Sequence, residues 1–182
     1  SLAGVYQKEN AVLALNALEE LDRLGWTTTM EQRKDGLLHT SWKGRFTVIH
    51  KKPLFIVDGA HNAGAADKMA ESVRHYFNGK KLIYIMGVFA DKEYKIVLEK
   101  TAHFAEKIYT IETPDNPRAL PAEELAKAAR VYNSSAESTK SIKDAVEKAF
   151  SCAGDDENSV ILAFGSLSFI GALTNAVEEY VG

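Results

Sequence analysis

The pattern of apolar and polar residues divides the chain into a helical N-terminal segment and a longer part in which strands and helices alternate. From Tyr6 to Leu24, apolar residues recur every three or four positions. This spacing predicts an amphipathic helix, and Gly25 is the expected left-handed cap after its last turn. Residues 26–44 have weak periodicity and contain two glycines, so we predict a second short helix and a loop there.

After residue 44, short runs that are apolar throughout alternate with longer amphipathic stretches. Continuous apolarity is typical of parallel strands that are covered on both faces. The repeated strand–helix order therefore predicts an α/β, Rossmann-like domain with a mostly parallel sheet and helices on both faces. Arg45–His50 and Leu54–Val57 are separated by a turn too short for a crossover, so they form an antiparallel hairpin at the N-terminal edge. The other predicted strands are Leu82–Met86, Ile108–Ile111, Val160–Phe164 and a short one near Ala136–Thr139, and the other predicted helices are Ala63–Phe77, Tyr94–Phe104, Pro121–Tyr132, Ser141–Ser151 and Leu167–Val181.

Composition narrows the class of protein. With 182 residues, of which 46% are hydrophobic, the chain has material for one core. Its formal net charge of -3 does not favour nucleic-acid binding, and no apolar run is long enough for a membrane span. The absence of a signal peptide and the single cysteine, Cys152, fit a cytoplasmic protein. The chain begins at Ser1 without Met, and we expect it to be a piece of a longer protein.

Four loops that follow predicted strands contain the residues most suited to binding a ligand, because ligands of such sheets lie beyond the carboxyl ends of the strands. The first is Asp58–Gly64, where Gly59 would let the backbone approach a ligand and the following helix N-terminus would favour an anion. The alternative is that Asp58 and Asn62 merely cap that helix and that His61 is a turn residue. The other three loops are Gly87–Lys92, Thr113–Ala119 and Gly165–Gly171. No histidine or cysteine has a partner at metal-ligand spacing, so we predict no metal ligands in this chain.

The loops also resemble a known family. Asp58–Asn62 reads Asp-Gly-Ala-His-Asn, which resembles the signature of folylpolyglutamate synthases, members of the Mur ligase superfamily. Gly44-Arg45-Phe46 and the run that opens at Tyr6-Gln7 and includes Asn10-Ala11 resemble two upstream elements of that family. The other three loops resemble downstream elements in the family's order, so the resemblance covers the whole chain. The sequence departs from the family at Ala63, where proline is common, at Glu93, where aspartate is common, and at Ser168 and Ala172, where an aromatic residue and a glutamate are frequent.

The resemblance implies an ATP-dependent ligase that adds L-glutamate to folates through an acyl phosphate, and that in some members also acts as a dihydrofolate synthase. The family has a phosphate-binding loop and Mg²⁺ ligands in an N-terminal ATPase domain, and this chain contains no Gly-Lys-Ser or Gly-Lys-Thr. Residues 1–44 would then be the tail of the central ATPase domain, and residues 45–182 the C-terminal domain. We expect the 1–44 segment to pack poorly by itself, because the ATPase domain of the same parent chain would cover its apolar residues.

The matched positions imply roles for individual side chains. Asn10 would bind the adenine edge, Arg45 the nucleotide phosphates and Asp58 the ribose hydroxyls. His61 would lie near the reacting groups, and Ser166 near the glutamate or the acyl phosphate. Three further residues are candidates for glutamate recognition because of the loops they occupy, with surface or loop-bracing roles as the alternative: Asp91, Lys92 and Arg118.

Three other readings stay open from the sequence. One is a different Mur-type amino-acid ligase, against which the wording Gly-Ala-His-Asn argues. Another is a nicotinamide-dependent dehydrogenase, although Met86-Gly87 stand where an acidic residue would end the second strand. The last is a non-enzymatic nucleotide-binding or docking module.

Overall fold

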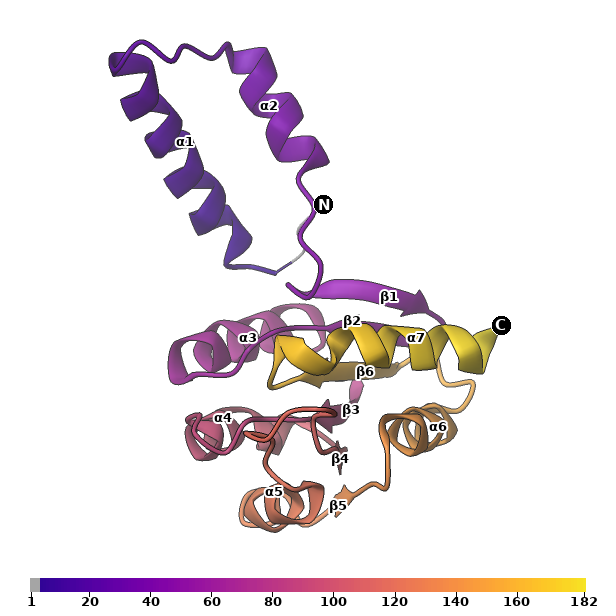
Figure 1. The fold of residues 1–182 in the computed structure, drawn as a ribbon. Coiled ribbons are helices and arrows are strands. Elements are labelled where there is room, and N and C mark those ends of the chain that lie inside the picture. Colours follow the sequence, from indigo (N-terminus) through magenta and orange to yellow (C-terminus); the bar gives the residue numbers. More distant parts are fainter. Residues whose placement is uncertain (1–3) are drawn as a thin grey trace.

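The fold of the chain is centred on a six-stranded sheet (Figure 1). The computed structural model describes residues 4–182 and gives the strand order β1-β2-β6-β3-β4-β5. β1 pairs antiparallel with β2, and the other four neighbouring pairs are parallel. The predicted α/β class, mostly parallel sheet and antiparallel edge hairpin are confirmed. The strands are β1 (Thr47–Lys51), β2 (Leu54–Val57), β3 (Lys81–Met86), β4 (Lys107–Thr110), β5 (Ala136–Ser138) and β6 (Ser159–Phe164). The helices are α1 (Gln7–Arg23), α2 (Met30–His39), α3 (Ala63–Tyr76), α4 (Tyr94–Thr101), α5 (Ala122–Ala129), α6 (Ile142–Ala153) and α7 (Ile170–Val181), with 3-10 turns η1 (Ala102–Phe104) and η2 (Leu167–Phe169).

Helices cover both faces of the sheet, which explains the continuous apolar runs within its inner strands. Successive side chains of a strand point to opposite faces. Leu82 and Tyr84 of β3 therefore pack in the core formed with α3, α4 and α5, whereas Ile83 and Ile85 pack with α6 and α7. All six residues of the central strand β6 are buried.

Two predicted boundaries are wrong for identifiable reasons. The first strand begins at Thr47 and not at Arg45, because Phe46 has a left-handed φ of 48° and its N–H bonds to a side chain outside the sheet. The predicted helix Pro121–Tyr132 ends at Ala129 in the structure. There Asn133 turns the chain away by donating from Nδ2 to the carbonyls of Ala102 and Ala105, at 2.9 and 2.6 Å.

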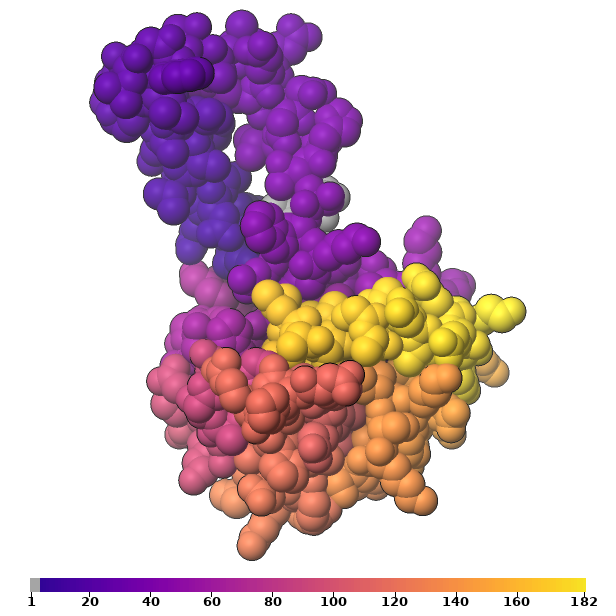
Figure 2. Space-filling view, in the orientation of Figure 1, coloured from indigo at the N-terminus to yellow at the C-terminus, as the bar shows by residue number. Residues whose placement is uncertain are grey.

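The two N-terminal helices form a hairpin that projects beyond the β1 edge of the sheet (Figures 1 and 2). Its turn is held by an ion pair of Arg33 with Asp22 and by a 2.9 Å bond from the Thr28 N–H to the Asp22 carboxylate. Neither helix contains a buried residue, and Leu13 and Trp26 are 69% and 75% exposed. This agrees with a segment that packs poorly by itself, while its assignment to a neighbouring domain stays a prediction. Within residues 4–182, no helix has the length and apolarity needed to cross a membrane.

Candidate functional site

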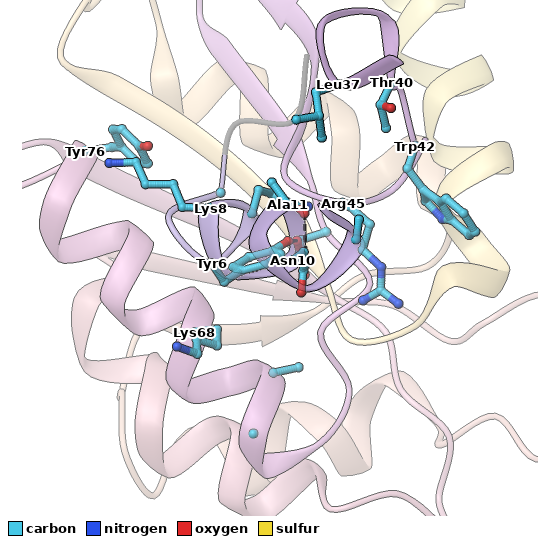
Figure 3. A pocket seen from close by; sticks show the side chains of 16 residues that line it. Tyr6, Lys8, Asn10, Ala11, Leu37, Thr40, Trp42, Arg45, Lys68 and Tyr76 are labelled. Carbon is cyan, nitrogen blue, oxygen red and sulfur yellow. Dashed lines mark hydrogen bonds between the residues drawn. The ribbon is translucent and has the colours of Figure 1, made fainter. Parts of the chain in front are cut away.

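A cavity of about 940 Å³ lies where the foot of the helical hairpin meets the α/β domain (Figure 3). Its walls come from the start of α1, the end of α2, the segment before β1, and α3. The three residues predicted to bind nucleotide, Asn10, Arg45 and Asp58, all line it. Residues from segments distant in sequence are thus brought to one site, as the resemblance implied, and Trp42 and Tyr76 add aromatic surface.

Asp58 occupies the carboxyl end of β2 and is 3% exposed. Its Oδ2 accepts hydrogen bonds from the Phe46 N–H at 2.8 Å and from the Tyr6 hydroxyl at 3.0 Å. Its Oδ1 accepts from the Ala60 N–H at 2.8 Å. Burial raises the pKa of the carboxyl above its ordinary value, and these three hydrogen bonds act in the opposite direction.

The alternative that Asp58 caps the following helix is wrong. The N-cap of α3 is Asn62, whose side chain accepts from the Ala65 N–H at 2.9 Å. The Asp58 carboxylate instead joins the segment before β1 and the segment before α1 to the loop after β2. Its role in the fold is therefore larger than that of a helix cap.

The structure also shows a packing role for Gly59. We predicted that its missing side chain lets the backbone approach a ligand. In the structure, a Cβ at Gly59 would lie 2.5 Å from Cδ2 of Leu167, and the Gly59 N–H donates to the Gly44 carbonyl at 2.8 Å. The glycine thus makes room for the Leu167 side chain, which packs over the loop.

His61 and Ser166 lie on the loops after β2 and β6, and neither is among the described residues that line the cavity. Nδ1 of His61 is 2.7 Å from the Gly59 carbonyl oxygen, so we assign the proton to Nδ1 and leave Nε2 as an acceptor. Ser166 is buried; its Oγ accepts from the Ser168 N–H at 3.3 Å and lies 2.7 Å from the Ser168 hydroxyl. The structure does not test their predicted catalytic roles.

Two of the three glutamate-recognition candidates contact each other. Arg118 donates from Nε and Nη2 to the Asp91 carboxylate at 3.2 and 2.5 Å, and its guanidinium lies 4.9 Å from the centroid of the Phe89 ring. Arg118 lowers the pKa of the Asp91 carboxyl below its ordinary value. The backbone N–H of Lys92 donates to the Phe89 carbonyl at 3.1 Å. The loops that follow β3 and β4 are thus joined at the carboxyl ends of these strands. The recognition of glutamate there stays a prediction.

Sequence reasoning left two site residues without a role. Tyr6 stands in the run that opens α1, and its hydrogen bond to Asp58 spans 52 positions of sequence. Lys68 of α3 lines the cavity and pairs with Glu9 of α1 at 2.9 Å. Tyr6 belongs to the run that resembles a family element, but no pattern in the sequence connects it to Asp58, and nothing in the sequence pattern marked Lys68.

Two residues that line the cavity have groups suited to binding a nucleotide. Asp58 offers acceptors to hydroxyls, and Arg45 offers a planar fork of donors to phosphates. Within residues 4–182, no three His, Cys, Asp or Glu side chains are grouped so as to hold a metal ion.

The fold and the sequence motifs define the class of this protein. The family model described as "Mur ligase, glutamate ligase domain" matches residues 44–167, and the chain belongs to that family. Among curated relatives, dihydrofolate synthase/folylpolyglutamate synthase of Bacillus subtilis strain 168 is 29% identical over 179 residues, which is 98% of this chain and 40% of the relative. Folylpolyglutamate synthase of Lacticaseibacillus casei is 28% identical over 121 residues, 66% of this chain and 28% of the relative.

Solved structures of two related enzymes have the same fold. Mycobacterium tuberculosis folylpolyglutamate synthase complexed with ADP matches with a TM-score of 0.83 and 25% identity over 97% of this chain and 41% of that one. Folylpolyglutamate synthase from Thermotoga maritima matches with a TM-score of 0.74 and 26% identity over 96% of this chain and 39% of that one. The chain therefore spans about 40% of the length of these relatives.

Proposed function

We propose that this chain is the nucleotide- and glutamate-contacting part of an ATP-dependent ligase that adds L-glutamate to folates through an acyl phosphate. The observation that carries the proposal is the meeting of Asn10, Arg45 and Asp58 in one cavity. The names of the relatives support the substrate class, since both curated relatives are folylpolyglutamate synthases and one is also a dihydrofolate synthase. The ADP complex of the M. tuberculosis enzyme supports a nucleotide as the occupant.

The proposed roles follow the chemistry of each side chain. Asn10 would meet the adenine edge with its amide, and Arg45 would meet the phosphates. Asp58 would accept hydrogen bonds from the ribose. His61 and Ser166 would stand near the reacting groups, where Nε2 of His61 offers an acceptor for a proton.

The reaction needs further groups that these residues do not supply. Negative charge on the transferred phosphoryl group calls for Mg²⁺ and cations. We propose that the metal ligands and the phosphate-binding loop belong to an ATPase domain of the same parent chain, and that Asp91, Lys92 and Arg118 recognise glutamate. We also propose a cytoplasmic location, because folates, ATP and glutamate would have to meet there.

Ligand-induced thermal shifts test the proposal on the chain as it stands. ATP should raise the melting temperature, whereas NAD at equal concentration should not. Arg45→Ala should weaken ATP binding roughly tenfold or more, because a charged hydrogen bond to phosphate is lost. Arg23→Ala is the matched control, since Arg23 is exposed on α1 and pairs with Glu20.

Activity assays, together with the thermal shifts, separate the remaining interpretations of the chain's function. The chain alone should not join glutamate to a folate, because its site would be complete only when a second domain closes on it. ATP-dependent joining by this chain alone would contradict that division of labour. A shift with NAD and none with ATP would favour a dehydrogenase instead.

A further inference from the structure

The hydrogen bonds of Asp58 raise a question of capacity. An ionised carboxylate has about four lone-pair positions for donors. Three are taken in this structure: two on Oδ2, by Phe46 N–H and the Tyr6 hydroxyl, and one on Oδ1, by Ala60 N–H. Among the donors from residues 4–182, none occupies the second position on Oδ1.

A ribose presents two neighbouring hydroxyls, and a carboxylate binds such a diol through both of its oxygens. The first hydroxyl would take the remaining position on Oδ1. The second needs a position on Oδ2, where both are filled. The Phe46 donor is a backbone group next to β1, while the Tyr6 donor is at the end of a half-buried side chain.

We propose that Tyr6 is a positioning residue whose hydroxyl holds, on Asp58, the acceptor position that the second ribose hydroxyl requires, and that it gives up this position when a nucleotide binds. The inference rests on the proposed nucleotide site and goes beyond it. It makes the Tyr6 hydroxyl and a ribose hydroxyl competitors for one oxygen.

The exchange has a consequence for the hairpin. Tyr6 directly precedes α1, so its bond to Asp58 fastens the first leg of the hairpin to the domain, while Phe46 fastens the second leg. Among residues 4–182, the first leg is also held by the exposed Lys68–Glu9 pair and by a 3.4 Å bond from the Val5 N–H to the Ser72 hydroxyl. Exposed pairs of this kind are weak. Nucleotide binding therefore loosens the start of α1 and leaves the second leg in place.

The test compares Tyr6→Phe with the unmodified chain by NMR titration of ¹⁵N-labelled protein, which detects millimolar affinities. The Phe46 and Ala60 amides report directly on Asp58. Tyr132→Phe is the matched control, because it removes a hydroxyl from an exposed tyrosine that does not line the cavity. ATP and 2′,3′-dideoxy-ATP are the two probes, and the second cannot offer a diol.

Tyr6→Phe should bind ATP about threefold to tenfold more tightly than the unmodified chain, because a competitor for Asp58 is gone. The two proteins should bind dideoxy-ATP equally, and Tyr132→Phe should behave as the unmodified chain does. Equal or weaker ATP binding by Tyr6→Phe would overturn the exchange while leaving the nucleotide site intact. Absence of ATP binding by all three proteins would instead overturn the proposed nucleotide site.

A second measurement does not depend on the variant. In the unmodified chain, ATP should increase hydrogen exchange of amides at the start of α1 and leave the Phe46 amide protected. Increased protection at the start of α1 would show that Tyr6 stays on Asp58, and the proposed replacement of Tyr6 by a ribose hydroxyl would be wrong.

Discussion

The carboxylate of Asp58 accepts donors from three separate segments of the chain: Tyr6 before α1, Phe46 before β1 and Ala60 after β2. A carboxylate that is nearly removed from water pays for desolvation when it ionises, and donors offset that cost. At this residue the desolvation is the larger effect, so the pKa is raised. A substitution at Asp58 therefore tests the fold as well as the ligand site.

The raised pKa predicts how stability depends on pH. Asp58 binds its proton more tightly in the folded chain than in the unfolded chain, where its carboxyl has the ordinary pKa of 3.8. The contribution of this group to the free energy of unfolding is therefore fully present below that value and is lost as pH rises through the folded pKa. Asp58→Asn cannot ionise and should lack this dependence. Both proteins can be unfolded with denaturant at a series of pH values from 3.8 upward. The free energy of unfolding of the unmodified chain should fall relative to that of Asp58→Asn as the pH rises. A difference in free energy that does not change with pH would contradict the prediction.

Single residues of the candidate site were predictable to different degrees. Asn10, Arg45 and Asp58 stand in runs that resemble family elements, and they do meet in one cavity. The role of Tyr6 was not predictable, because it depends on a contact between positions that no local pattern connects. The contact of Gly59 with Leu167 was not predictable for the same reason, since Leu167 follows the carboxyl end of β6.

At the scale of strands and helices, hydrophobic pattern was a reliable guide to position. β2 has the bounds that were predicted, and β3 and β6 each begin one residue earlier than predicted. The ends that were missed depend on single tertiary features, such as the left-handed backbone of Phe46. Burial on both faces gives a strand its continuous apolar run, whereas the point at which pairing stops is decided by what lies beside it.

The close approach of β6 and β3 just beyond their carboxyl ends predicts a sharp effect of one methyl group. Gly165 has a left-handed φ of 116°, and a Cβ there would clash with the Gly87 carbonyl and lie 2.8 Å from Cγ1 of Val88. Gly165→Ala should lower the free energy of unfolding by about 2 kcal/mol or more. Gly171→Ala is the control, because Gly171 lies in α7 with open space around its Cα, and should raise stability by up to about 1 kcal/mol. Denaturant unfolding measures both, and equal effects would contradict the packing argument.

At the scale of the whole molecule, the chain is a compact α/β domain with a hairpin that has no core of its own (Figure 1). The two cores lie on the two faces of the sheet, and the described residues that form them all lie from Phe46 onward. The domain should therefore fold without the hairpin, while the hairpin adds exposed apolar surface that includes Leu13, Trp26 and Leu38.

Removal of residues 1–41 tests this division. The shortened chain should unfold cooperatively, with a melting temperature lowered by only a few degrees for the lost Tyr6 bond. It should also bind less of a hydrophobic dye and associate less at high concentration than the full chain does. In the full chain, Trp26→Ser should reduce association and Glu31→Ser should not. Loss of cooperative unfolding in the shortened chain would show that the hairpin is part of the folding unit.

Both legs of the hairpin are attached to the domain at Asp58, so a small movement there can turn the whole hairpin. α1 has 17 residues and extends about 25 Å from its foot. The Phe46 N–H holds one leg of the hairpin on Asp58, and the Tyr6 hydroxyl, whose release we propose above, holds the other. A displacement no longer than a hydrogen bond at the Tyr6–Asp58 contact would become a much larger displacement of the turn near Trp26. A domain that contacts this turn would therefore change its orientation when Asp58 loses its hydrogen bond from Tyr6.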